Sequence, residues 1–194
     1  MEALKAIRSA VPTFESVTED EAKSHLRIAR SNEDHHDDLV RLIQQSRENF
    51  ERDTDYVIAT GTYVVKLSEW PIGDCIELPV RPVSSITSIA YLDTAGVSQT
   101  MSSGDYSLNT YGSRHKVQLG YGETWPTIRG WENDITITFV AGYASRSVVP
   151  ANIKQACLLE IARLFENRGD SIKDEPTGKA YERIVSRYAR SSYP

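Results

Sequence analysis

The chain has 194 residues, of which 40% are apolar and 25% charged, close to the average for soluble globular proteins. This composition argues against a disordered chain and against a membrane protein, and the length is enough for one large domain or two small ones. The net charge of −5 argues against a general DNA-binding protein, because neutralising phosphates needs clustered Lys and Arg that outweigh their acidic neighbours.

Helix signals come first along the chain. Thr18 followed by Glu21 is the pattern of a capping box, and it predicts a short helix that runs to Ile28. A longer helix is expected to start after Asn32, where acidic residues suit a helix N-terminus, and to end near Asp53. Its apolar residues share one face at helical spacing: Leu39, Val40, Leu42, Ile43 and Phe50.

Strand-like segments fill the middle of the chain, roughly residues 56–143. Alternating Ile135, Ile137 and Phe139 predict a strand with one buried face. Because no helical pattern separates the segments, they favour an antiparallel sandwich or small barrel over a parallel sheet. The expected strands are residues 56–60, 62–67, 75–78, 85–92, 97–101, 106–109, 116–119 and 134–140, with a hairpin joining 85–92 to 97–101.

Two more helices are predicted near the C-terminus. The first begins at Pro150 and ends at Gly169, and its apolar face contains Ile153, Cys157, Ile161, Leu164 and Phe165. The second follows Pro176 and has a basic face. Residues 177–194 contain four basic residues and one acidic residue, whereas residues 31–55 contain eight acidic residues and three arginines. The charge is therefore polarised between helices.

An apolar stripe on two short helices cannot be buried by those helices alone, so the leading and trailing helices are expected to pack together. This predicts an α+β fold in which a helical bundle from the N- and C-terminal helices carries an inserted antiparallel β domain. The expected parts are the N-terminal bundle helices (1–55), the β domain (56–145), the C-terminal bundle helix (146–175) and a C-terminal helix or tail (176–194).

The two cysteines, Cys75 and Cys157, lie in segments of different character, so we expect no disulfide framework and a protein that stays in a reducing cytoplasm. Cys157 lies on an apolar stripe and is expected to be a core residue rather than a reactive thiolate. Residues 1–11 contain no long apolar segment, so neither a secretory signal nor a membrane anchor is expected.

Few residues suggest catalytic chemistry. His35, His36, Asp37 and Asp38 are the residue types that bind divalent ions, and they are the basis of an alternative hypothesis, a metal-dependent hydrolase. Consecutive helical residues diverge by about 100° each, so a solvated first turn is the preferred interpretation. Gly178 and Lys179 lack the first glycine of a phosphate loop. The sequence therefore predicts no enzyme, no catalytic residues, no metal and no cofactor.

Aromatic residues and glycines cluster in the segment 121–131. Tyr121, Trp125 and Trp131 are candidates for an interface with a partner, since planar side chains often fill pockets at interfaces. An equally weighted alternative is a loop that folds back to cap the β domain. A site that stacks a sugar or a base is a third interpretation, and it underlies the alternative function of a carbohydrate- or receptor-binding module.

Several segments together resemble a known family, the head-tail connector (adaptor) proteins of tailed bacteriophages and gene transfer agents. The resemblance spans about residues 18–168. Its segments are 21–28 (EAKSHLRI) with the acidic helix start, 82–89 (PVSSITSI) with 91–93 and Gly96, 105–106, 121–122 with 125–126, 139–143 (FVAGY), 149–150 with 153–156 (IKQA), and 166–168 (ENR).

The resemblance implies a non-enzymatic structural protein in the neck of the virion. It implies that copies of this chain form a ring, which has twelve members in the family, and that the ring docks under the portal protein. The ring is expected to contact a downstream neck or tail protein and to surround DNA without sequence-specific binding. In related proteins the C-terminal segment reaches the portal. The corresponding candidates here are Tyr181, Ile184, Val185 and Tyr188 with Arg183, Arg187 and Arg190.

Overall fold

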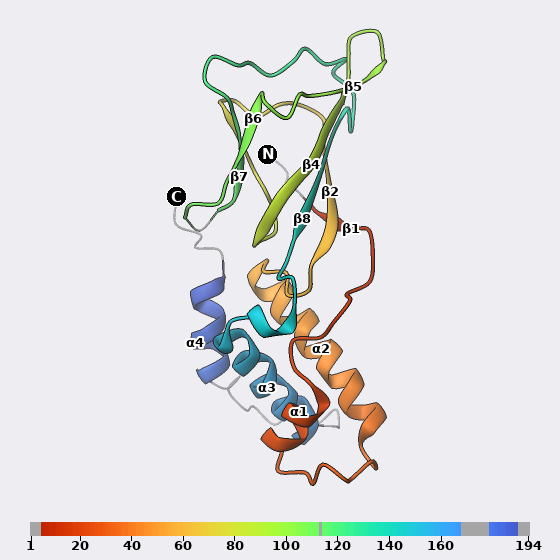
Figure 1. Cartoon of the computed structure of the whole chain (residues 1–194), viewed down its shortest axis with the longest axis vertical. Helices are drawn as coiled ribbons and strands as arrows, with labels where there is room; N and C mark the ends of the chain where they lie inside the picture. The colour runs from red at the N-terminus through yellow and green to blue at the C-terminus, as the bar shows by residue number, and fades with distance from the viewer. Residues whose placement is uncertain (1–4, 113, 168–178, 190–194) are drawn as a thin grey trace. The chain divides into compact units, whose positions relative to one another are not determined.

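The computed structural model describes residues 5–112, 114–167 and 179–189. Within these ranges it has four α-helices and eight strands in two antiparallel sheets, which confirms the predicted α+β class. The chain divides into two compact units (Figure 1). The β unit contains residues 5–11 and 60–142, and the helical unit contains residues 12–59, 143–167 and 179–189. None of the described helices is long and apolar enough to cross a membrane.

Helix α1 (Glu19–His25) begins with the predicted capping box. The Thr18 hydroxyl accepts a hydrogen bond from the Glu21 N–H at 3.1 Å, and the Glu21 carboxylate accepts one from the Thr18 N–H at 2.6 Å. The helix ends three residues before the predicted Ile28. Arg27 adopts a left-handed conformation (φ 59°), and the Ile28 N–H bonds back to the Lys23 carbonyl, which closes the helix.

Helix α2 (His36–Thr54) starts later than the acidic segment suggested. The Asn32 side chain accepts a hydrogen bond from the Asp34 N–H at 2.8 Å, so residues 32–34 form a turn instead of helix. At the other end, Asp55 adopts the left-handed conformation (φ 59°) that terminates many helices. The predicted end near Asp53 is therefore correct to within one residue.

Helix α3 (Ala151–Glu166) follows a short 3₁₀ turn, η1 (Arg146–Val148), and has Pro150 at its N-cap. Gly169 and Pro176, the predicted boundaries of the last two helices, lie outside the described residues. Helices α1 and α3 and the last helix, α4 (Lys179–Tyr188), all contact α2. The buried core of this unit contains Val17, Ala22, Leu39, Leu42, Ile43, Phe50, Ile58, Val149, Ile153, Ala156, Cys157 and Ile161.

The larger sheet has five strands in the order β1-β2-β8-β4-β5. These are β1 (Ile7–Arg8), β2 (Gly61–Leu67), β8 (Ile135–Ala141), β4 (Val83–Leu92) and β5 (Ser98–Thr100). In β8 every second residue is fully buried, as the alternation predicted. The predicted hairpin is confirmed, because β4 pairs with β5 from Ala90–Thr100 to Leu92–Ser98.

Strand β1 was not expected, because residues 1–55 were assigned to the helical part. Ile7 pairs with Val64 and Arg8 with Tyr63, so this short segment belongs to the β unit. The Arg8 guanidinium donates to the Thr60 carbonyl at 3.1 Å, and a side chain at Gly61 would collide with it. A two-residue strand is too short for a detectable periodicity.

The smaller sheet has three strands in the order β3-β7-β6, namely β3 (Cys75–Glu77), β7 (Lys116–Leu119) and β6 (Tyr106–Asn109). Each sheet has two open edges, so the described residues form no closed barrel, which was one of the two predicted β architectures. All eight strands are antiparallel to their neighbours.

The predicted strand at residues 56–60 is wrong. This segment makes only isolated bridges, at Tyr56 and between Ala59 and Tyr143, and joins no ladder, although Val57, Ile58 and Ala59 are buried. The Ile58 N–H instead donates to the Glu51 carboxylate at 2.8 Å. Its β-branched residues are therefore explained by burial in the connection after α2, not by sheet pairing.

Candidate functional sites

The four apolar portal-contact candidates all lie on the inner face of α4. Ile184 and Val185 pack against the core of the helical unit. The Tyr188 ring meets the rings of Phe50 and Tyr56 edge to face, with centroids 5.8 and 5.0 Å apart. The hydroxyl of Tyr181 donates to the Asp53 carboxylate at 3.0 Å, and burial together with that carboxylate raises the pKa of Tyr181. Within the chain, these side chains hold α4 against α2 and α3.

The basic candidates lie on the other face of α4. Arg183 and Arg187 are exposed, as is Lys179 at the start of the helix. Neither arginine has an ion pair within the described part of the chain, whereas Arg190 lies outside it. Helix α4 therefore presents two guanidinium groups to solvent while its apolar face is covered.

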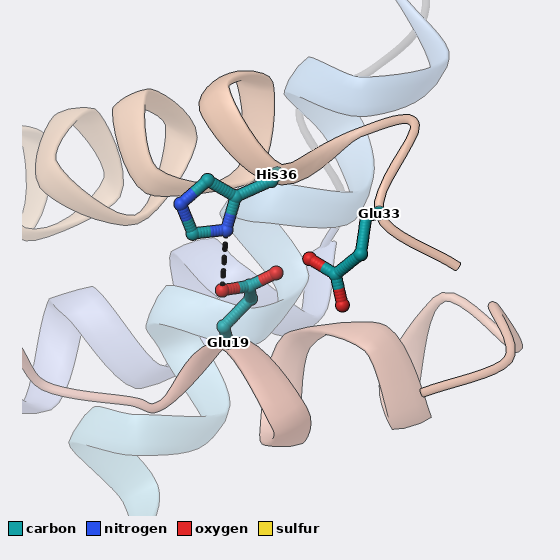
Figure 2. A group of neighbouring side chains, drawn as sticks. All are labelled: Glu19, Glu33 and His36. Atoms are coloured by element: carbon teal, nitrogen blue, oxygen red, sulfur yellow. Dashed lines mark hydrogen bonds and ion pairs between the residues drawn. The ribbon is translucent and has the colours of Figure 1, made fainter. Parts of the chain in front are cut away.

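Figure 2 shows a polar cluster in the helical unit that joins the start of α1 to the start of α2. Ligand atoms of Glu19, Glu33 and His36 lie within 4.8 Å of one another, and the Nδ1 atom of His36 is 2.9 Å from the Glu19 carboxylate. An imidazole and two carboxylates are a donor set that divalent ions accept. This geometry makes the cluster the best candidate for a cation among the described residues.

A lysine already supplies positive charge to this cluster. The Lys23 ammonium lies 2.9 Å from Glu19 and 3.4 Å from Glu33 and also donates to the Arg30 carbonyl, and its side chain is only 3% exposed. The hydrogen bond to Glu19 raises the pKa of Lys23, and the bonds from Lys23 and His36 lower that of Glu19. The cluster is thus a polar link between α1 and α2 in which Lys23 already pairs with both carboxylates.

The residues of the metal hypothesis are not brought together. His36 contacts Glu19, whereas the His35 ring meets Phe165 edge to face at 5.5 Å, and Asp38 pairs with Arg41 at 2.7 Å. Their side chains diverge around the first turn of α2, as the helical geometry predicted. Asp38 and Arg41 also line a surface hollow of about 320 Å³.

Trp125, an interface candidate, has a structural role in the β unit. Its ring stacks on Trp70 with centroids 4.6 Å apart and an interplanar angle of 9°. Its indole N–H donates to the Gly73 carbonyl, and that of Trp70 donates to the Pro126 carbonyl, both at 2.8 Å. The two tryptophans therefore join the loop after β2 (68–74) to the loop before β8 (120–134).

The other two interface candidates are exposed. Tyr121 is fully exposed, and Trp131 is 69% exposed. The Arg129 guanidinium lies over the Trp131 ring at 5.1 Å and pairs with the buried Asp134 at 2.7 Å. Hydrogen bonding from the Trp131 N–H and from Arg129 lowers the pKa of Asp134. The Trp131 ring is thus exposed, while its backbone N–H is held by a hydrogen bond to Asp134.

Sequence reasoning missed Trp70, Ile72 and Lys23. Trp70 and Ile72 lie in a short loop without periodicity, and Trp70 meets a partner more than fifty residues away. Lys23 occupies a position in the short helix α1 where a charged residue is normally expected to face solvent. A buried lysine so close to a capping box gives no signal in the sequence.

No protein-family model matches the chain, and no curated protein matches it in sequence. Solved structures do. A chain in the neck of an empty gene transfer agent (GTA) particle, computed with C6 symmetry, superposes with a TM-score of 0.80. It is 22% identical, and the match covers 98% of this chain and 97% of the other.

The fold is that of a gene transfer agent neck chain. A chain from the virion of a native GTA particle matches with a TM-score of 0.79, at 22% identity and over 97% of both chains. One from the neck of a native GTA particle computed with C12 symmetry gives 0.76, at 22% identity and over 98% and 97%. The predicted resemblance to the connector proteins of phages and gene transfer agents is confirmed at the level of the fold.

Proposed function

We propose that this chain is a structural protein of the neck of a phage-like virion, a head-tail connector that joins the capsid to the tail. The observation that carries the proposal is the structural match over 98% of the chain, which includes both the helical and the β unit. A match that covered one unit alone would support only a shared domain.

In this proposal the N- and C-terminal helices form the bundle body of each subunit, and the β domain is inserted between them. About twelve copies close into a ring beneath the portal, as in the resembled family, and DNA passes through the opening without sequence-specific binding. A ring needs two different faces on each subunit that meet head to tail. The acidic α2 and the basic outer face of α4 offer such a pair, with charge to set the register.

The portal contact is assigned to the C-terminal helix. Its exposed Arg183 and Arg187 are the groups available for direct contact, and Tyr181, Ile184, Val185 and Tyr188 hold the helix in place for them. A structural role also agrees with the polar cluster of Glu19, Glu33 and His36 (Figure 2), because the Lys23 ammonium already pairs with both of its carboxylates. We propose no enzymatic activity and no cofactor.

The proposal is tested by measuring the mass of the purified chain by native mass spectrometry, alone and with the cognate portal protein. We expect a ring in one of the two samples, and mass spectrometry of purified particles should detect the chain in the virion. A chain that stays monomeric with portal and is missing from particles would overturn the proposal.

The alternative function, a carbohydrate- or receptor-binding module, has less support from the geometry. One face and the N–H of Trp125 are used by the contacts with Trp70 and Gly73. Titration with glycans, followed by tryptophan fluorescence, separates the two functions because a connector gives no saturable response.

A further inference from the structure

Two loops of the β unit are joined at several points. The loop 68–74 and the loop 120–134 are linked by the Trp70–Trp125 stack and its two indole hydrogen bonds. At the ends, the Leu119 N–H donates to the Asp74 carbonyl at 2.8 Å, and the Asn133 N–H donates to the Ser68 hydroxyl at 3.3 Å. Both loops lie at the end of the β unit that carries the β4–β5 turn (Figure 1).

These fixed loops expose large apolar side chains. Ile72 and Tyr121 are fully exposed, one from each loop, and Trp131 is largely exposed. Exposed aromatic and aliphatic side chains on a rigid backbone are typical of interaction hot spots, since little ordering entropy is lost on binding.

The same loops are acidic. Glu69, Asp74, Glu123 and Glu132 are exposed and have no ion pair within the described residues. The one basic residue of the two loops, Arg129, is paired with the buried Asp134. Four carboxylates without an ion pair, in the loops that carry Ile72 and Tyr121, repel phosphate groups, which argues against nucleic acids and acidic lipids as the surface's ligand.

We propose that this acidic loop surface, made by loops 68–74 and 120–134, docks onto a different protein chain that offers lysines and arginines around apolar pockets. The inference rests on the proposed function. The described surface hollows of this chain are lined in part by acidic side chains, Asp38 in one and Asp20 and Glu21 in the other, so another copy offers the acidic loops no purely basic apolar pocket there. The partner is therefore another neck, portal or tail protein and not a second copy of this chain.

Intact wild-type particles provide the first test. A carbodiimide joins a carboxylate directly to a lysine amine only where the two are in contact. We expect Glu69, Asp74, Glu123 or Glu132 to become linked to lysines of a different protein, identified by mass spectrometry. Links to lysines of other copies of this chain, or carboxylates that react only with a small amine added to the solution, would overturn the proposal.

Substitution provides the second test. Ile72→Ser with Tyr121→Ser removes two exposed anchors, and each truncation is expected to weaken binding about 30-fold, the size of a hot-spot effect. Particles carrying this variant should retain the chain but lose the linked partner. Tyr111→Ser is the matched control, because Tyr111 is equally exposed but precedes β7, at the strand end opposite Tyr121.

The two tests separate this inference from the proposed function. Loss of the chain from wild-type particles would contradict the neck assignment itself. If the chain is present in particles, retention of the partner by the Ile72→Ser and Tyr121→Ser variant, or an equal loss with Tyr111→Ser, would overturn the acidic loop surface alone.

Discussion

At the scale of single residues, the helical unit depends on buried cations that connect distant segments. Arg47 on α2 donates to the carboxylates of Glu15, Glu48 and Glu51, at 2.9, 3.2 and 3.0 Å, and its side chain is 7% exposed. Glu51 in turn accepts the N–H of Ile58. One guanidinium therefore ties the segment before α1, helix α2 and the connection after it.

Replacing Arg47 by Met is expected to lower the free energy of unfolding by about 3 kcal/mol, because the partly buried carboxylates of Glu15 and Glu51 lose their shared, mostly buried partner. Urea unfolding followed by the helical circular dichroism signal measures this loss. Arg52→Met on the same helix is the control, since Arg52 is exposed with one surface ion pair, and it should change stability by less than about 0.5 kcal/mol. Equal losses in both variants would contradict the role of Arg47.

His115 makes the β unit sensitive to acid. Its Nδ1 atom accepts the Val83 N–H at 2.9 Å, and burial together with the Arg81 charge lowers its pKa below the ordinary 6.5. The folded state therefore favours the neutral ring, so its contribution to stability is complete above pH 6.5 and is lost as the pH falls through the lowered pKa.

We expect the β unit to lose stability between about pH 7 and pH 5. Tryptophan fluorescence reports this unit, because Trp70, Trp125 and Trp131 all lie in it. His115→Asn keeps an acceptor near the Val83 N–H without a titrating ring, so its unfolding midpoint should fall less over the same range. An identical fall in wild type and variant would show that another group is responsible.

At the scale of elements, α4 is an amphipathic helix whose two faces have separate roles. Its aromatic and aliphatic residues complete the core over α2 and α3, and its arginines face solvent. The helical spacing in the sequence correctly separated the apolar residues of this helix from its basic residues. It did not distinguish whether the apolar face meets the same chain or a partner, because either would bury it equally well.

Substitutions on the two faces of α4 should give opposite results. Tyr188→Ala removes the ring contacts with Phe50 and Tyr56 and is expected to cost about 2 kcal/mol of unfolding free energy, because the ring is partly buried. Arg183→Glu with Arg187→Glu should leave stability within about 0.5 kcal/mol and weaken binding to portal.

Thermal unfolding and co-purification with portal measure the two effects. Portal binding that survives reversal of both arginines would contradict the assignment of the basic face. A Tyr188→Ala protein as stable as wild type would contradict the packing role of the inner face.

At the scale of the whole molecule, each of the two units has its own buried core and its own side-chain hydrogen bonds and ion pairs. The helical unit combines residues 12–59 with residues from 143 onward, so segments more than a hundred residues apart share one core. The Asn49 amide, for example, donates to the Glu160 carboxylate of α3 at 2.7 Å. Contacts of such long range stabilise the subunit that we propose to assemble into a ring.

Local patterns in the sequence determined the type and order of most elements. The capping box at Thr18, the alternation along β8 and the turn after β4 each depend on neighbouring residues, and the structure has them where they were predicted. They are readable because helix and strand periodicities follow from the backbone geometry of a few consecutive residues.

The tertiary structure alone decided what each face and loop contacts. It placed Ile7–Arg8 beside β2 and stacked Trp125 on Trp70. It also packed the apolar face of α4 against the core of the helical unit and put Lys23 between Glu19 and Glu33. Periodicity specifies that a face is buried but not by what, because the partner is chosen by packing between residues distant in sequence. For that reason Tyr121 could be named from the sequence as an interface candidate, whereas Ile72 became visible only when the two loops were seen joined.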